Sequence, residues 1–234
     1  MSDVPFDAYA DQYDYWFLAN KQVLDSEVKL LAYALGENPG RCLSVGCGSG
    51  LFETCLARDY DLHIKEGVEP FEGMRAIAIK RGLDVQAASA ETMSLSEAAY
   101  DTIIFNGCSS YLADPAAAFE KARSALKPGG RLLVLDVPKE SAYGLLYNFG
   151  RATGGWSHPD LQGVTPEKIY PLEFVQAAQW TTTPAKIKQL EALGFHSITT
   201  AQTLVRHPVY TNDEVEEPIP GFDRGGYVCI TAHQ

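Results

Sequence analysis

The amino-acid sequence predicts one α/β domain with a mostly parallel sheet of seven strands and helices on both faces. Three observations support this prediction. Apolar runs of strand length alternate with helical patterns, which is typical of parallel sheets. The first of these runs ends in a cluster of glycines that opens a helix. The chain has 234 residues, 46% of them hydrophobic, which is enough for one domain with a full core.

The glycine cluster is the stretch around which the other elements are arranged. The apolar run 42–45 predicts a buried strand, and Gly46, Gly48 and Gly50 follow it with single residues between them. A helical apolar pattern starts at Leu51. Glycine takes positive φ at little cost and lets a ligand approach bare backbone, and the first N–H groups of a helix have no helical partner. The stretch therefore predicts a nucleotide-type site at the carboxyl end of the first strand.

Composition excludes several classes of protein. The formal net charge is -11, and Lys80-Arg81 is the strongest basic cluster, so we expect no nucleic-acid partner. No apolar run approaches the ~20 residues that a transmembrane helix needs, and the acidic start 1–7 does not resemble a signal peptide. The five cysteines form no C-x-x-C pair, which indicates reduced thiols in the cytoplasm and no metal site.

The remaining elements follow in the order that an α/β fold requires. Before the glycines, residues 24–35 carry one apolar stripe of a helix. After them, strands are expected over 62–68, 84–88, 100–106, 131–137, 197–205 and 226–232. Helices are expected from Leu51, after the second strand up to Gly82, from Asp114-Pro115 and from Thr183-Pro184.

The glycine pattern is G-x-G-x-G. A dinucleotide fingerprint would need its third glycine at position 51, which is Leu51. The run Val45-Gly46-Cys47-Gly48-Ser49-Gly50 instead resembles the first cofactor motif of the S-adenosylmethionine-dependent methyltransferases of the Rossmann-like class. The run Leu126-Lys127-Pro128-Gly129-Gly130, followed by an apolar strand, is similar to a late motif of the same family. The resemblance covers nearly the whole core, from Arg41 to Ala232.

This resemblance implies a division of the chain and a set of cofactor contacts. Residues 1–40 would form an N-terminal helical cap, 41–137 and 181–234 the core, and 138–180 an acceptor lid inserted after the fifth strand. The residues that it assigns to S-adenosylmethionine are Tyr13, Gly46, Cys47, Gly48, Gly50, Glu69, Pro70, Ala90, Glu91 and Asn106.

Two of these assignments have their own physical argument. Glu69 ends the second strand, where a carboxylate can accept hydrogen bonds from both ribose hydroxyls; the alternative is a solvated loop charge. The family places a segment like Ala90-Glu91 beside the adenine, and the alternative is a helix that begins with Ser89 as its N-cap.

The loop after the fourth strand bears on the acceptor. Its sequence is Asn106-Gly107-Cys108-Ser109, whereas many nucleic-acid and protein amide methyltransferases have Asn/Asp-Pro-Pro-Tyr/Phe at this point. The difference argues against methylation of an adenine or a glutamine amide. We interpret Cys108 as a buried free cysteine rather than a reactive one.

Aromatic residues are concentrated in two further segments. Residues 5–20 form either a helix that packs on the domain or a cap over the cofactor, and both can hold together. The segment 138–180 is also aromatic, which favours an apolar acceptor pocket, and Gly154-Gly155 is a plausible hinge. Its single histidine, His158, is the candidate general base, although a lone histidine is more often structural or solvated.

The function expected is methyl transfer from S-adenosylmethionine to a small molecule with apolar or aromatic character. Two alternatives are a nicotinamide-dependent oxidoreductase, against which Leu51 counts, and a cofactor-binding protein without transferase activity. Neither the acceptor atom nor the oligomeric state follows from the sequence.

Overall fold

The structure is a computed structural model that describes residues 10–234, with side chains from Gln12 onward. Within these residues the strands are β1 (Cys42–Val45), β2 (Glu66–Val68), β3 (Asp84–Gln86), β4 (Tyr100–Asn106), β5 (Leu126–Asp136), β6 (His196–Thr203), β7 (Ile219–Pro220) and β8 (Tyr227–His233). The α-helices are α1 (Ala10–Ala19), α2 (Lys21–Leu35), α3 (Leu51–Tyr60), α4 (Glu72–Lys80), α5 (Pro115–Ala125), α6 (Ala142–Thr153), α7 (Leu172–Ala177) and α8 (Thr183–Ala192).

All the strands of the described residues form one sheet in the order β3-β2-β1-β4-β5-β8-β6-β7. Strands β1 to β5 are parallel, and β8 runs antiparallel to both β5 and β6. The sheet thus has eight strands within residues 10–234, and the prediction of seven is wrong by one. The additional strand, Ile219–Pro220, has two residues and pairs with β6 at the edge. A strand this short carries no alternating pattern, and proline is tolerated only at such an edge.

Two strands begin at other residues than the sequence predicts, because pairing with the neighbouring strand decides where each one starts. The second strand begins at Glu66 rather than at residue 62. The fifth begins at Leu126, because Leu126 already pairs with Tyr100 and the register then shifts by a bulge before Thr102 pairs with Arg131. The Lys127-Pro128-Gly129-Gly130 run is therefore an irregular part of the strand rather than a turn outside it.

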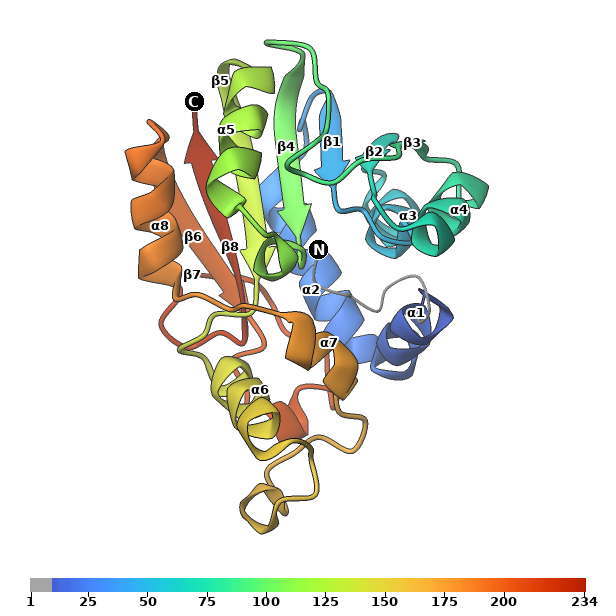
Figure 1. Cartoon of the computed structure of the whole chain (residues 1–234), viewed down its shortest axis with the longest axis vertical. Helices are drawn as coiled ribbons and strands as arrows, with labels where there is room; N and C mark the ends of the chain where they lie inside the picture. Colours follow the sequence, from blue (N-terminus) through green and yellow to red (C-terminus); the bar gives the residue numbers. More distant parts are fainter. Residues whose placement is uncertain (1–9) are drawn as a thin grey trace.

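Each face of the sheet has its own hydrophobic core. Figure 1 shows the helices that cover the two faces. Alternate residues of β4 and β5 point to opposite faces, as the pleat requires. Ile104 and Leu133 pack with α2 and α3, whereas Phe105 and Val134 pack with α5 and α8. Helices therefore cover both faces, as the sequence predicted.

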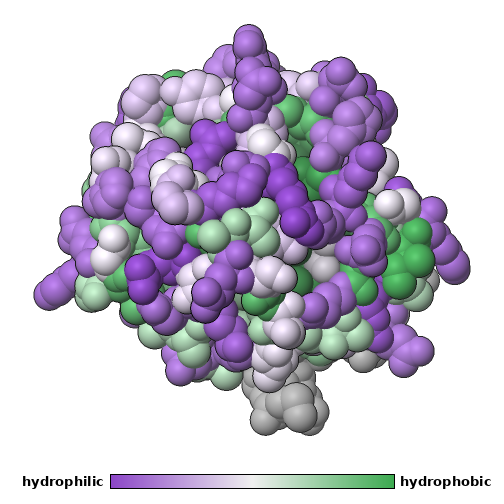
Figure 2. All heavy atoms as spheres, turned by 90° about the horizontal axis from the view of Figure 1, so that it is seen from above, coloured by the Kyte–Doolittle hydropathy of each residue, from purple (hydrophilic) through white to green (hydrophobic). Residues whose placement is uncertain are grey.

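The parallel strands end at the edge of the sheet where α1, α6 and α7 gather (Figure 1). The opposite edge, seen from above in Figure 2, is covered mainly by hydrophilic side chains with small separate apolar groups. Ligands of doubly wound folds bind at the carboxyl ends of the strands, so the edge near α1, α6 and α7 is the place to look for a site. In the described part of the chain, no helix is long and apolar enough to cross a membrane.

Candidate cofactor and acceptor site

The glycine turn is shaped by packing at its two ends and is open at its centre. Gly46, Gly48 and Gly50 have φ values of 66°, 56° and 74°, which glycine adopts at little cost. A Cβ at Gly46 would lie 2.7 Å from Cys108 Cβ, and one at Gly50 would lie 3.2 Å from Leu83 Cδ1. A Cβ at Gly48 would meet no atom within 4 Å. Gly48 therefore borders open space in which a ligand can lie directly against the backbone.

Glu69 lies beside this turn, directly after β2. Its side chain is buried, with the residue 4% exposed. The N–H of Gly48 donates to its Oε2 at 3.0 Å, and the N–H of Phe71 donates to its Oε1 at 2.9 Å. The alternative of a solvated loop charge is therefore wrong. The next residue, Pro70, is exposed, and Arg75 donates to the carbonyl oxygens of both Glu69 and Pro70.

The thiols near the turn are not activated. Cys47 Sγ lies over β2, where a Cβ on Gly67 would approach it to 2.7 Å. Burial raises the pKa of the Cys47 thiol, and burial likewise raises the pKa of Cys108, whose Sγ donates to the carbonyl oxygen of Val45 at 3.1 Å. Thiolates are the reactive form of cysteine, so neither residue is a nucleophile in this environment. Cys108 is half-buried, as a packed free cysteine would be.

Ala90 and Glu91 follow β3 in a turn rather than at the start of a helix. The N–H of Met93 donates to the Ser89 carbonyl oxygen, and no helix follows, so the N-cap alternative for Ser89 is wrong. Ala90 is buried. Glu91 Oε1 accepts hydrogen bonds from the N–H groups of Ala113 and Asp114, at 2.9 and 3.3 Å, and so connects this turn to the start of α5.

Helix α1 is attached directly to the glycine turn. The hydroxyl of Ser49 donates to Asp14 Oδ1 at 2.5 Å, and Arg81 forms an ion pair with Asp14 Oδ2 at 2.7 Å. Arg81 also donates to the Ser49 carbonyl oxygen at 2.9 Å. Asp14 is 8% exposed, so this network is largely shielded from water. The aromatic residues Phe6 and Tyr9 of the expected N-terminal cap lie outside the described residues.

The same helix packs against the segment 138–180. Trp16 donates from Nε1 to the carbonyl oxygen of Lys168 at 3.0 Å, and its ring lies 4.9 Å from that of Tyr170. The ring of Tyr13 lies 5.9 Å from that of Phe174 in α7. The two aromatic segments that the sequence singles out are thus in contact with each other.

His158 is placed away from the glycine turn. It precedes the short 3-10 helix Pro159–Leu161. Figure 1 shows the connection between α6 and α7, which contains this helix, at the end of the molecule opposite β1. Its side chain is 39% exposed, its Nδ1 accepts a hydrogen bond from Asp160, and its ring contacts Phe149. These contacts resemble those of a solvated surface histidine and give no support to a general base. Gly154, at φ 74°, is the C-cap of α6.

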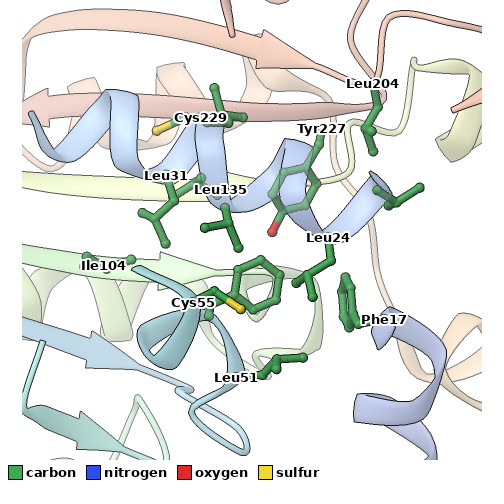
Figure 3. Close-up of a cluster of buried hydrophobic side chains, with 14 of the residues drawn as sticks. Phe17, Leu24, Leu31, Leu51, Cys55, Ile104, Leu135, Leu204, Tyr227 and Cys229 are labelled. Carbon is green, nitrogen blue, oxygen red and sulfur yellow. The ribbon is translucent and has the colours of Figure 1, made fainter. Parts of the chain in front are cut away.

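A group of buried and half-buried tyrosines belongs to the hydrophobic cluster that includes residues of α1, α2 and α6. Tyr227 opens β8, and Figure 3 shows its ring beside Leu24 and Leu135 with the hydroxyl directed away from the strand. That hydroxyl donates to Asn106 Oδ1 at 3.0 Å, which ties the group to the end of β4. The other members are Tyr13, Tyr111, Tyr143, Tyr147 and Tyr170.

Glu27 of α2 lies within this tyrosine group, and sequence reasoning missed it. The residue is 6% exposed. Burial, followed by the nearby negative charge of Asp136, raises the pKa of the Glu27 carboxyl well above its usual value. A signal was present in the sequence: Glu27 stands at the border of the apolar stripe that Leu24, Val28 and Leu31 define.

A second buried carboxylate, Asp136, ends β5 and is fully partnered. Its Oδ2 pairs with Lys186 Nζ at 2.8 Å and accepts hydrogen bonds from the hydroxyls of Ser109 and Ser110, and its Oδ1 accepts from the Val137 N–H. Lys186 also lines a cavity of about 380 Å³ between α5 and α8. In the described residues, no group of three or more histidine, cysteine, aspartate or glutamate side chains could hold a metal ion.

Comparison with known proteins identifies the family. The model of a methyltransferase domain family matches residues 17–181, which is more than half of the chain. An uncharacterized protein of Methanocaldococcus jannaschii is 29% identical over 229 residues, which cover 98% of each chain.

Solved structures agree with this assignment. A Thermotoga maritima protein described as an S-adenosylmethionine-dependent methyltransferase, possible histamine N-methyltransferase, superposes with a TM-score of 0.82 at 28% identity over 97% of each chain. The plantazolicin methyltransferase BpumL, solved with S-adenosylhomocysteine, has the same fold with a TM-score of 0.61 at 13% identity, covering 97% of this chain and 90% of its own. The open backbone at Gly48 and the carboxylate of Glu69 fit such a cofactor. The chain therefore belongs to the methyltransferase domain family, as a class I member whose cofactor is S-adenosylmethionine.

Proposed function

We propose that this protein methylates a small-molecule acceptor held between α1 and the segment 138–180, which acts as its lid. The observation that carries the proposal is the contact between these two aromatic segments directly beside the glycine turn, through Asp14, Trp16 and Tyr170. Aromatic side chains on both sides of an acceptor would suit a small molecule. The net charge of -11 argues against a nucleic-acid acceptor. The five free cysteines would suit the reducing cytoplasm, where we place the protein.

The cofactor would lie along the carboxyl ends of β1, β2 and β4. Backbone at Gly46, Cys47, Gly48 and Gly50 would approach it, Glu69 with Pro70 would hold its ribose, Ala90 and Glu91 would lie near its adenine, and Tyr13 and Asn106 would flank its methionine end. When bound, it supplies an electrophilic methyl group on a sulfonium. The task of the protein is then to align the acceptor with that group and to keep water out, and alignment alone can lower the barrier by several kcal/mol.

Glu69 provides the first test of this arrangement. Replacement of Glu69 by Gln keeps the shape of the side chain but removes the negative charge beside the ribose position. We expect the affinity for S-adenosylmethionine in calorimetry to fall about tenfold or more, in line with the loss of a charged hydrogen-bond partner. Glu120→Gln, on the exposed side of α5, is the matched control and should bind normally. Unchanged affinity of Glu69→Gln would refute the ribose assignment.

Turnover tests the transferase activity itself. Formation of S-adenosylhomocysteine would be followed with a panel of small amines, thiols, phenols and carboxylic acids. Amines belong in the panel because of the description of the Thermotoga neighbour. Binding of the cofactor without turnover on any class would favour the alternative of a cofactor-binding protein without transferase activity.

A further inference from the structure

The starting point is the unusual environment of Glu27. The residue is 6% exposed, and among the described residues its carboxylate forms no hydrogen bond and no ion pair, while its oxygens keep some access to solvent. An unpartnered buried carboxylate is costly for a folded protein. Asp136 shows the usual solution, because a lysine, two serines and a backbone N–H satisfy it. A cost of this kind suggests that the partner of Glu27 comes from outside the chain.

Tyrosine side chains from several elements pack in the same hydrophobic cluster as Leu24 and Val28, the neighbours of Glu27 on α2. The rings of Tyr143 and Tyr147 in α6 lie 5.5 Å apart, and those of Tyr147 and Tyr170 stack at 5.7 Å. The nearby charge of Glu27 adds to burial in raising the pKa of their hydroxyls, so these groups stay neutral near pH 7. The tyrosines that this charge affects are Tyr13, Tyr143, Tyr147, Tyr170 and Tyr227.

The tyrosines extend to the position where the methyl group of the cofactor is expected. The hydroxyl of Tyr227 donates to Asn106 Oδ1, and a Cβ on Gly107 would lie 3.2 Å from the same hydroxyl. Tyr13 belongs to α1, whose next residue, Asp14, is bound to Ser49 of the glycine turn. The tyrosines therefore connect α6, which carries Tyr143 and Tyr147, with the ends of β4 and of the glycine turn.

The chemistry of this group selects for a cation. Aromatic faces attract ammonium ions, and a buried carboxylate does so more strongly in a medium of low dielectric constant. Glu27 has no lysine, arginine or histidine partner in the described residues, so the site has no positive charge of its own to offer an anionic acceptor. The one buried lysine nearby, Lys186, is already paired with Asp136.

We propose that Glu27 and the surrounding tyrosines form the acceptor site and that the acceptor is an organic amine, which enters as its ammonium ion. The proposal rests on the proposed function, since it names the substrate class of the same site. Glu27 would bind the ammonium group and take one proton from it. The nitrogen lone pair would then form the new bond to the methyl carbon while the carbon–sulfur bond breaks and its electron pair stays on sulfur. The products are the methylated ammonium ion and S-adenosylhomocysteine.

Binding can be tested apart from turnover. Calorimetry on the protein saturated with S-adenosylhomocysteine would compare four cations (methylammonium, benzylammonium, tetramethylammonium and choline) with 3,3-dimethylbutan-1-ol, a neutral isostere of choline. We expect the wild-type protein to bind at least one of the cations and to bind choline more tightly than its isostere. Glu27→Gln should lower cation affinity by about tenfold or more, as expected for the loss of a charged partner, while binding of S-adenosylhomocysteine stays unchanged.

Asp25→Asn is the matched control, because Asp25 belongs to the same helix, two residues before Glu27, but pairs with Lys21 at the surface. It should bind cations as the wild-type protein does. The proposal is overturned if none of the cations binds, or if Glu27→Gln binds them as tightly as the wild type does, which would leave Glu27 a purely structural buried carboxyl. Turnover of thiols or phenols that survives Glu27→Gln would overturn it while leaving the proposed methyltransferase function intact. A protein that binds the cations but transfers no methyl group would instead contradict the proposed function.

Discussion

At the scale of single residues, the three glycines of the turn have different structural roles. The lack of a side chain at Gly46 and Gly50 makes room for Cys108 and Leu83. At Gly48 the space beside the backbone is not filled by any other part of the described chain. The sequence pattern predicts that all three matter, but it does not separate packing from ligand contact. That separation depends on which neighbours pack against the turn, and these come from the loop after β4 and from the residues after α4.

We therefore expect Gly48→Ala to lose cofactor affinity and keep its fold. The added methyl group enters the space beside the turn, so binding of S-adenosylmethionine in calorimetry should weaken about tenfold or more. The strain of an alanine at φ 56° is on the order of 1–2 kcal/mol. Gly129→Ala is the matched control, because Gly129 also has positive φ and open space but lies in the irregular start of β5. Equal affinity in the two variants would show that Gly48 serves only the backbone conformation.

At the scale of elements, the sequence predicted the parallel core well and its additions less well. The order of the strands and helices follows from alternation of apolar periods, and Asp114 and Thr182 cap their helices through side-chain hydrogen bonds. The strand Ile219–Pro220 was missed because its pairing is decided by β6 rather than by its own residues. Long-range contacts also decide the site: Glu27, on α2, meets tyrosines from α1, α6 and β8, and no local pattern encodes that meeting.

The attachment of α1 to the glycine turn gives a prediction at this scale. Asp14→Asn removes the ion pair with Arg81 and leaves that guanidinium without its carboxylate. We expect the free energy of unfolding to fall by about 1–3 kcal/mol, in the range for a partly shielded charged partner, and amide exchange in α1 to become faster. Asp59→Asn, which removes an exposed pair with Arg58, should change neither quantity measurably. Exchange in α1 that is the same in Asp14→Asn and wild type would show that other contacts hold the helix.

At the scale of the whole molecule, the site lies where two independently recognisable parts meet. The core supplies the turn, Glu69 and Tyr227 of β8, and α1, α2 and α6 supply other tyrosines and Glu27. An unpartnered carboxyl in this place lowers the free energy of unfolding. Because burial disfavours the ionised form, this loss of stability grows as the pH rises.

Glu27→Gln should therefore become more stable than the wild type as pH rises. Burial raises the pKa of Glu27 in the folded protein above its ordinary value of 4.5, so the unfolded chain ionises first and the wild type loses stability above that pH. Asp136 and the hydroxyls of Tyr13, Tyr143, Tyr147, Tyr170 and Tyr227 are the titratable groups that interact electrostatically with the carboxyl, and they are the same in both proteins.

The measurement is urea unfolding of both proteins between about pH 5 and about pH 8, without ligand. The difference in the free energy of unfolding should grow by up to ~1.4 kcal/mol per pH unit until the pKa of the folded state is passed, and then stay constant. The other buried acid with a raised pKa, Glu53, cancels in the comparison because both proteins contain it. A saturating ammonium ligand should reduce the difference, since it stabilises the ionised form of Glu27 only. A difference that is flat over this range would mean that Glu27 is ionised in the folded protein at the same pH as in the unfolded chain, and the carboxyl would then have a partner or water that offsets its burial.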